Sequence, residues 1–66
     1  MPLVEVTLTQ GRSADQLRSL IHEVHQAVVN AVDAPPAAVR VIIREVPAAH
    51  WASGDVTIEE RRAGQP

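Results

Sequence analysis

The hydrophobic period changes twice along this chain, and these changes restrict the fold more than any other feature. Residues 3–9 alternate between apolar and polar side chains, a period of two that is typical of a strand. Residues 17–32 carry apolar side chains at the i, i+3, i+4 spacing of an amphipathic helix. Residues 39–46 alternate again. A strand, a helix and a second strand within about 45 residues predict a βαβ unit with parallel strands and a right-handed crossover.

Both ends of the predicted helix carry sequence signals. The run Ser13-Ala14-Asp15-Gln16 is a capping box, in which the Ser13 side chain accepts from the backbone N–H of Gln16 and the Gln16 side chain reaches back. Asp15 suits the positive end of the helix dipole. Asp33-Ala34-Pro35-Pro36 ends the helix, because two prolines cannot continue it.

The segment after the second strand has turn chemistry. Pro47-Ala48-Ala49 breaks that strand, and the run from Trp51 to Asp55 precedes a short β-branched run, Val56-Thr57-Ile58. We interpret this segment as a small hairpin or arm laid against the sheet of a neighbouring subunit. Residues 59–66 are charged and then rich in helix breakers, so we expect them to be frayed. The predicted fold is α/β: a single βαβ unit with parallel strands plus a short C-terminal hairpin, in one domain over residues 1–66.

Small size makes assembly of several chains the expected route to stability. The chain has 66 residues and no Cys, so neither a disulfide nor a thiolate-bound metal can reinforce it. A chain of this size hides only about 60% of the surface that its unfolded form exposes. Apolar residues make up 45% of the composition and aromatics 2%, so burial rests on aliphatic side chains. Much of that surface is expected to lie between subunits.

Charge and hydropathy exclude several classes of partner. The formal net charge of −2 provides no electrostatic footprint for nucleic acid and no polybasic membrane anchor. The start of the chain lacks the basic region and apolar core of a signal peptide. No run approaches the roughly 20 apolar residues that span a bilayer. A cytoplasmic protein is the resulting expectation.

Several of these segments together resemble the 4-oxalocrotonate tautomerase family. They are the Met1-Pro2 start with its strand, Gly11-Arg12-Ser13 before the helix, Val39-Arg40-Val41-Ile42-Ile43 in the second strand, and Trp51. The resemblance covers nearly the whole chain and weakens after Trp51. It implies a cofactor-free enzyme with an amino-terminal proline as general base. It also implies a homohexamer, a trimer of dimers in which each dimer joins two βαβ units into a four-stranded sheet and the sites combine residues from different subunits.

Pro2 would supply the base. A proline after the initiator methionine is small enough for the methionine to be trimmed, which leaves a free secondary amine. A free α-amine titrates near 8. An apolar pocket or nearby guanidinium groups lower that value toward neutrality. A base of this kind can both take and return a proton near the working pH.

Four further residues would form the site by resemblance. Arg12 grips the remote carboxylate of a dicarboxylate substrate, and Arg40 acts near the 2-hydroxy or 2-oxo end and stabilises the developing dienolate charge. Trp51 forms a hydrophobic wall that keeps the proline desolvated, and Leu8 contributes to the substrate pocket. Simpler readings stay open, since Arg40 could be the exposed member of an alternating strand and Trp51 could serve ordinary packing.

Other residues suggest no cofactor and no metal. His22 and His25 lie three apart on the helix, which is not the His-Glu-x-x-His spacing, and no Cys supports a metal site. His50 adjoins Trp51 without an assigned role. After the aromatic residue, members of the family often carry a Gly-Ile-Gly-Gly type of turn, whereas this chain has Ala52-Ser53-Gly54-Asp55. Ser53 therefore alters the apolar wall, and Asp55 adds a carboxylate.

Three functions follow from these residues. The first is a tautomerase that converts a 2-hydroxydienoate or similar enol, such as 2-hydroxymuconate, to the conjugated 2-oxo acid. The second is a family dehalogenase or hydratase acting on a haloacrylate, which needs a carboxylate to activate water beside the proline; only Asp55 lies close in sequence to the matching turn. The third is a catalytically inactive assembly subunit, favoured if Met1 is retained, because an acylated proline nitrogen is an amide without a basic lone pair.

Overall fold

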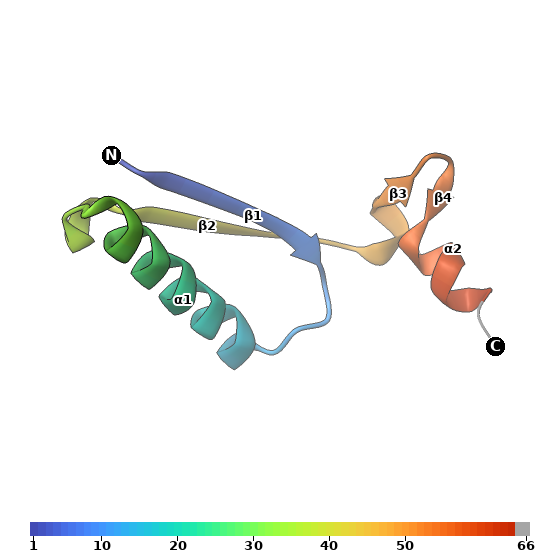
Figure 1. The fold of residues 1–66 in the computed structure, drawn as a ribbon. Helices are drawn as coiled ribbons and strands as arrows, with labels where there is room; N and C mark the ends of the chain where they lie inside the picture. The colour runs from blue at the N-terminus through green and yellow to red at the C-terminus, as the bar shows by residue number, and fades with distance from the viewer. Residues whose placement is uncertain (65–66) are drawn as a thin grey trace.

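The computed structural model describes residues 1–64 as a βαβ unit followed by a short arm (Figure 1). The elements in chain order are β1 (Leu3–Thr9), α1 (Ala14–Val32), the 3₁₀ turn η1 (Pro36–Ala38), β2 (Arg40–Val46), the 3₁₀ turn η2 (Ala48–His50), β3 (Ala52–Ser53), β4 (Val56–Thr57) and α2 (Ile58–Ala63).

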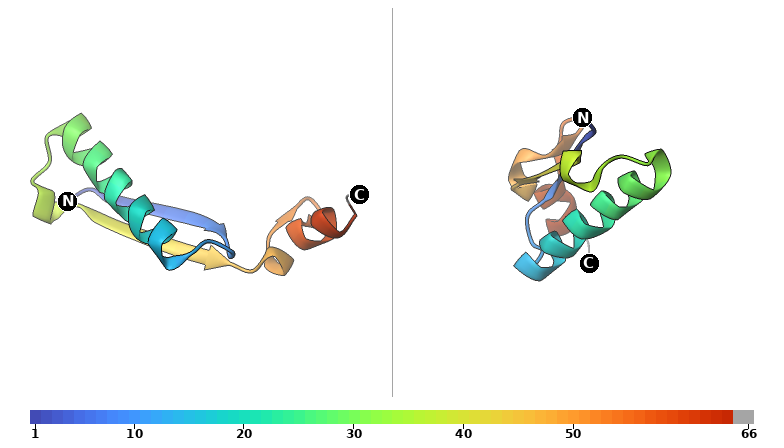
Figure 2. Two further views of the ribbon diagram at one scale, coloured as in Figure 1. Left: turned by 90° about the horizontal axis from the view of Figure 1, so that it is seen from below. Right: turned by 90° about the vertical axis from the view of Figure 1, so that its left-hand side faces the viewer.

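Strands β1 and β2 pair in parallel, as the alternation of the two segments predicted. The register runs from Leu3 opposite Arg40 to Thr9 opposite Val46. Helix α1 connects the strands and lies along one face of the two-stranded sheet (Figures 1 and 2). The predicted α/β fold with parallel strands and a C-terminal hairpin is confirmed.

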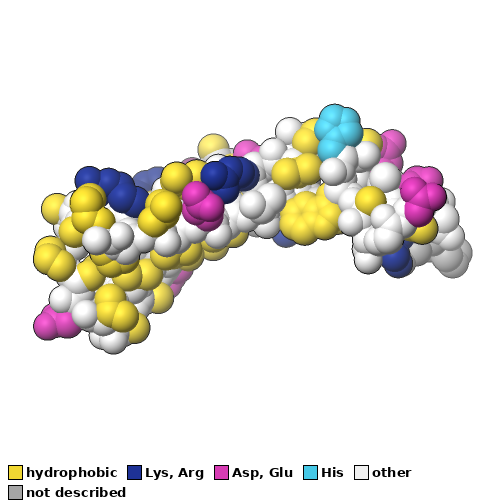
Figure 3. Space-filling view, turned by 90° about the horizontal axis from the view of Figure 1, so that it is seen from above, with side chains coloured by type: hydrophobic (Ala, Val, Ile, Leu, Met, Phe, Trp, Pro, Cys, Tyr) yellow, Lys and Arg dark blue, Asp and Glu magenta, His cyan; other side chains and the backbone are white. Residues whose placement is uncertain are grey.

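Helix α1 covers one face of the sheet and leaves the other face exposed. On the α1 side, Val4 and its strand partner Val41 are partly covered. The other face is open: Leu3 is 55% exposed and Ile42 is 42% exposed. Arg44 and Glu5 form a salt bridge of 3.3 Å there, with both side chains about half exposed. Seen from this side, hydrophobic side chains lie at the surface among basic and acidic ones (Figure 3).

Both predicted ends of α1 are observed. The Ser13 hydroxyl accepts from the Gln16 backbone N–H at 3.1 Å, and the Gln16 side-chain oxygen accepts from the Ser13 backbone N–H at 2.9 Å. Asp33 follows the last turn with φ 54° and ψ 40°, the left-handed conformation that commonly closes helices. The prolines then carry the chain away from the helix.

The arm corrects one expectation. Strands β3 and β4 form the predicted antiparallel hairpin, turning at Gly54 with φ 64°. Residues 58–63, however, form helix α2 instead of a frayed tail, so Ile58 begins a helix and does not extend the strand. A second capping box explains the difference, because the Thr57 hydroxyl accepts from the Glu60 N–H and the Glu60 carboxylate accepts from the Thr57 N–H. Residues 65 and 66, the end of the segment expected to fray, lie outside the described residues.

The second capping box also lowers the pKa of the Glu60 carboxyl group. The hydrogen bond from the Thr57 backbone N–H, followed by that with the Thr57 side chain, holds the pKa of Glu60 below its ordinary value of 4.5. Both hydrogen bonds favour the ionised form, which is the form that accepts them.

Burial within one chain is slight. Among the described residues, Ala34 and Val39 are the buried hydrophobic residues, Thr9 is the buried polar one, and no side chain is fully enclosed. The molecule measures 46 × 25 × 16 Å, because the arm extends away from the βαβ unit (Figures 1 and 2). One chain therefore has no closed core. Within residues 1–64, no helix combines the length and the apolar composition that crossing a membrane requires.

Replacement of Ser13 tests the first capping box. We expect Ser13→Ala to lower the free energy of unfolding by about 1 kcal/mol, because the backbone N–H of Gln16 loses its partner. The measurement is the urea midpoint at a fixed protein concentration. Ser19→Ala, in the exposed middle of α1, is the matched control and should be neutral or slightly stabilising. Equal midpoints for both variants would contradict a capping role.

Candidate functional site

Pro2 lies at the start of β1 and is held by the sheet. Its carbonyl oxygen accepts the backbone N–H of Arg40 at 2.9 Å, one step before the first strand partners. The residue is partly covered. Chain ends usually fray unless a strand ties them down, and here the β1–β2 ladder does so. The first residues therefore have a defined position.

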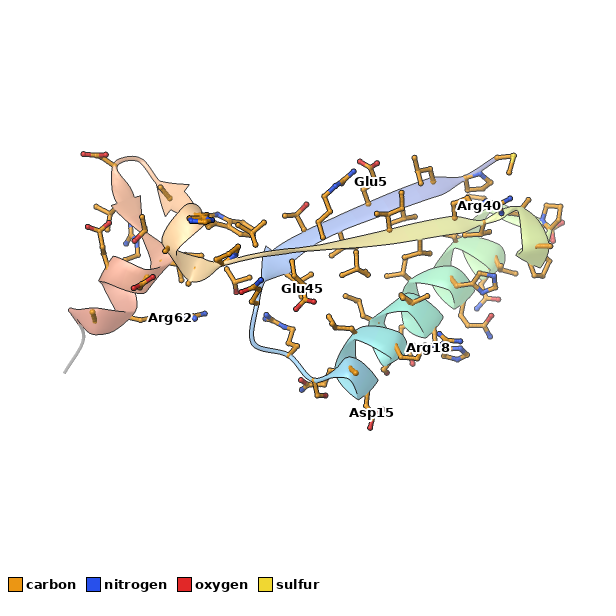
Figure 4. All side chains as sticks on the ribbon, turned by 180° about the vertical axis from the view of Figure 1, so that it is seen from behind. Glu5, Asp15, Arg18, Arg40, Glu45 and Arg62 are labelled. Atoms are coloured by element: carbon orange, nitrogen blue, oxygen red, sulfur yellow. The ribbon has the colours of Figure 1, made fainter. Side chains whose placement is uncertain are left out.

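The Arg40 side chain belongs to the open face of the sheet. Its Nη1 donates to the carbonyl oxygen of Ala37 at 2.8 Å, and the residue is exposed. Neighbouring Val39 is 8% exposed and lies on the helix side. Because successive side chains along a strand point to opposite faces, Arg40 shares a backbone hydrogen bond with Pro2 while its side chain points away from α1. Figure 4 labels Arg40 at this end of the sheet.

The other predicted site residues gather at the opposite end of the sheet. Arg12 follows the end of β1, and its Nη1 donates to the carbonyl oxygen of Thr9 at 3.0 Å. Leu8 is partly covered near the same end. Trp51 follows β2 and η2 and remains 36% exposed. The Gln10 N–H donates to the Val46 carbonyl at 2.9 Å, which joins the two strands at this end.

The predicted site residues of a single chain consequently fall into two separate groups, which we call half-sites. The amino-end half-site is Pro2 with Arg40, and the carboxyl-end half-site is Leu8, Arg12 and Trp51. Strand β1 has seven residues, which at about 3.3 Å per residue separates the half-sites by roughly 20 Å. A small dicarboxylate cannot bridge that distance. The predicted residues can therefore meet around one substrate only if the two half-sites come from different chains.

The turn that differs from the usual family sequence, Ala52 to Asp55, lies in the arm. Ser53 pairs with Val56 in the β3–β4 hairpin, and Asp55 is exposed at its tip. His50 ends η2 directly before Trp51 and is also exposed. Within the described chain, no hydrogen bond joins any of these three residues to Pro2.

One further cluster escaped the reasoning from sequence. A groove between α1 and β2 is lined in part by Arg18, His22 and His25. These residues lie four and then three positions apart on one flank of the helix, a spacing that could have revealed a basic column. Because His22 and His25 were considered only as metal ligands, Arg18 was not grouped with them.

Comparison with known proteins decides the family. The model of the family described as tautomerase enzyme matches residues 2–61, which include both half-sites. This chain belongs to the tautomerase family.

Individual relatives agree with that assignment. A probable tautomerase of Ralstonia nicotianae is 53% identical over 51 residues, covering 77% of this chain and 73% of the relative. The 2-hydroxymuconate tautomerase of Stutzerimonas stutzeri is 43% identical over 54 residues, covering 82% and 86%. A solved heterohexamer 4-oxalocrotonate tautomerase from Chloroflexus aurantiacus superposes with a TM-score of 0.86 at 40% identity, covering 91% of this chain and 97% of that one. The chain is thus an isomerase of the 4-oxalocrotonate tautomerase type.

Proposed function

We propose that this tautomerase converts a 2-hydroxydienoate such as 2-hydroxymuconate to the conjugated 2-oxo acid, without a cofactor and with Pro2 as general base. The observation that carries the proposal is the hydrogen bond from the Arg40 N–H to the Pro2 carbonyl, which fixes the position of Pro2 in a chain that the tautomerase family model matches from residue 2 onward. The 2-hydroxymuconate tautomerase of Stutzerimonas stutzeri supports the choice of substrate.

The reaction is a proton transfer from oxygen to carbon. Once Met1 is removed, the neutral Pro2 nitrogen takes the hydroxyl proton of the substrate, and the electron pair of the broken O–H bond moves into the conjugated system. The same nitrogen then returns the proton to carbon, leaving a ketone at position 2. A single group can perform both steps when it is poised near the working pH.

The two arginines divide the work on the substrate. Arg40 acts near the 2-hydroxy end, where negative charge develops on oxygen, and this kind of electrostatic stabilisation is often the largest catalytic contribution. Arg12 grips the remote carboxylate through its planar guanidinium, which suits bidentate binding. Trp51 and Leu8 exclude water beside the base.

Assembly would complete the site. β1 pairs with β2 along one edge only, so its other edge is free among the described residues. We propose that β1 of a second chain pairs there in the antiparallel sense, making a four-stranded sheet. Such pairing puts the carboxyl-end half-site of the partner beside Pro2. Three such dimers would form a homohexamer and cover the exposed Leu3 and Ile42.

The role of Pro2 can be tested by its replacement. We expect Pro2→Ala to lower kcat/KM for ketonisation of 2-hydroxymuconate by about 100-fold or more, because positioned general bases contribute that much. The acidic limb of the pH profile, on which a general base becomes protonated, should also move, because a primary amine differs from the proline nitrogen in basicity and orientation. Equal rates for both proteins would remove Pro2 from the mechanism.

Two controls belong to this experiment. Intact mass must show loss of Met1 in the mature protein, since retained methionine makes the Pro2 nitrogen an amide and favours an inactive assembly subunit. Turnover of 3-chloroacrylate must be measured beside that of 2-hydroxymuconate. Faster haloacrylate turnover would favour the dehalogenase reading.

The arginines should affect different kinetic constants. We expect Arg40→Ala to lower kcat by about 100-fold with little change in KM, because its interaction strengthens in the transition state. Arg12→Ala should raise KM by about 10-fold or more through loss of charged hydrogen bonds to the remote carboxylate. Arg62→Ala, on the exposed α2, is the matched control and should behave as wild type. Wild-type constants in all three variants would show the assigned roles to be wrong.

Mixing of two impaired variants, assayed at a substrate concentration below KM, tests the shared site. In a pair of Pro2→Ala with Arg12→Ala chains, one site carries both replacements and the other carries neither. Co-refolding an equal mixture should therefore restore activity on the order of a quarter of the wild-type rate, given random pairing. A mixture that only averages the two parent rates would contradict a site shared between chains.

A further inference from the structure

The groove between α1 and β2 is lined by polar and apolar side chains that the proposed reaction does not use. Its volume is about 400 Å³, within the range of small-molecule sites. Five of its residues come from one flank of α1, Val39 lies directly before β2, and Val41 belongs to β2. The lining residues are Arg18, Ile21, His22, His25, Gln26, Val39 and Val41.

The polar side chains of the groove are able to donate hydrogen bonds. Arg18 contributes a guanidinium, His22 and His25 contribute imidazoles, and Gln26 contributes an amide, while no carboxylate is among the lining residues. In residues 1–64 the only salt bridge joins Arg44 to Glu5, so Arg18 has no carboxylate partner there. Figure 4 labels Arg18 on α1, which lies on the opposite side of the sheet from the salt bridge. The groove therefore presents uncompensated positive charge.

One hydrogen bond fixes the orientation of a ring. His25 Nε2 lies 2.9 Å from the carbonyl oxygen of Pro36. A carbonyl oxygen can only accept, so Nε2 carries the hydrogen and Nδ1 is left without an assigned partner. This contact ties the ring to η1 and removes Nε2 from any metal. A ligand with acceptor oxygens suits the remaining groups better than a cation does.

The base of the groove is aliphatic. Val39 is 8% exposed, and Ile21 and Val41 are partly covered, whereas Arg18 and His22 are exposed. Donors thus surround the opening and hydrocarbon lines the interior. An inorganic anion would leave that apolar surface without contacts, while a hydrocarbon alone would leave the charge unmatched.

We propose that this groove binds a small organic carboxylate, with its anionic group at Arg18 and its hydrocarbon body against Ile21, Val39 and Val41. The groove is distinct from the amino-end half-site, because Val39 and Val41 point toward α1 while Arg40 points to the open face. The proposal does not depend on Pro2 or on the tautomerase substrate.

Titration of the whole protein with benzoate tests the groove. Methyl spectra of Ile21, Val39 and Val41 and ring spectra of the histidines should shift saturably with benzoate. Benzamide, which has the same shape without the charge, should bind at least about 10-fold more weakly. Arg18→Gln should weaken benzoate binding by at least about 10-fold while leaving kcat/KM for the enol unchanged. Both residues are good helix formers, so this exposed substitution should preserve α1.

Matched variants separate the groove from the catalytic site. Arg12→Gln should leave the benzoate response of the groove methyls intact, and Arg62→Gln should change nothing. Arg18→Lys should recover part of the affinity by keeping the charge. Equal binding of benzamide and benzoate, unchanged affinity in Arg18→Gln, or shifts confined to residues around Pro2 and Arg40 would each overturn the proposal. So would groove methyls that stay silent because a neighbouring chain covers them.

Discussion

The parallel pairing of β1 with β2 is the interaction on which the arrangement of this molecule depends. Leu3 opposite Arg40 sets the register, and the hydrogen bond from the Arg40 N–H extends the ladder to Pro2. Parallel strands begin at the same end of a sheet and finish at the other. Both arginines of the proposed site are placed by this rule, Arg40 at the start of β2 and Arg12 beyond the end of β1.

The same pairing leaves one chain incomplete both in its packing and in its site. Helix α1 covers one face of the sheet, while Leu3 and Ile42 remain exposed on the other. The arm extends from the sheet and keeps Trp51 partly exposed. In the proposed assembly, a second chain on the free edge of β1 would bring a carboxyl-end half-site to Pro2, and further dimers would cover the exposed Leu3 and Ile42. Stability and catalysis would then share one cause.

Local sequence signals predicted the elements well where the determining contacts are local. Ser13 and Gln16 lie three residues apart and form the predicted cap, and the prolines after Asp33 end α1 as expected. The same signal at Thr57 and Glu60 was passed over because the charged and breaker-rich composition of residues 59–66 suggested fraying. Helix α2 was missed for that reason, although its capping box was readable. The roles of Pro2, Arg12 and Arg40 came from family resemblance, since alternation alone allowed Arg40 to be an ordinary exposed strand residue.

The sequence by itself determined the order of β1, α1 and β2 and the limits of α1, because hydrophobic period, caps and prolines act over a few neighbouring residues. The family was indicated by the resemblance of several segments to known proteins. Only the tertiary structure decided that Pro2 lies beside Arg40, that the Arg40 side chain points away from α1, and that Arg18 and the two histidines share a groove with Val39 and Val41. These relations depend on the register and packing of segments far apart in the chain. No local pattern specifies them.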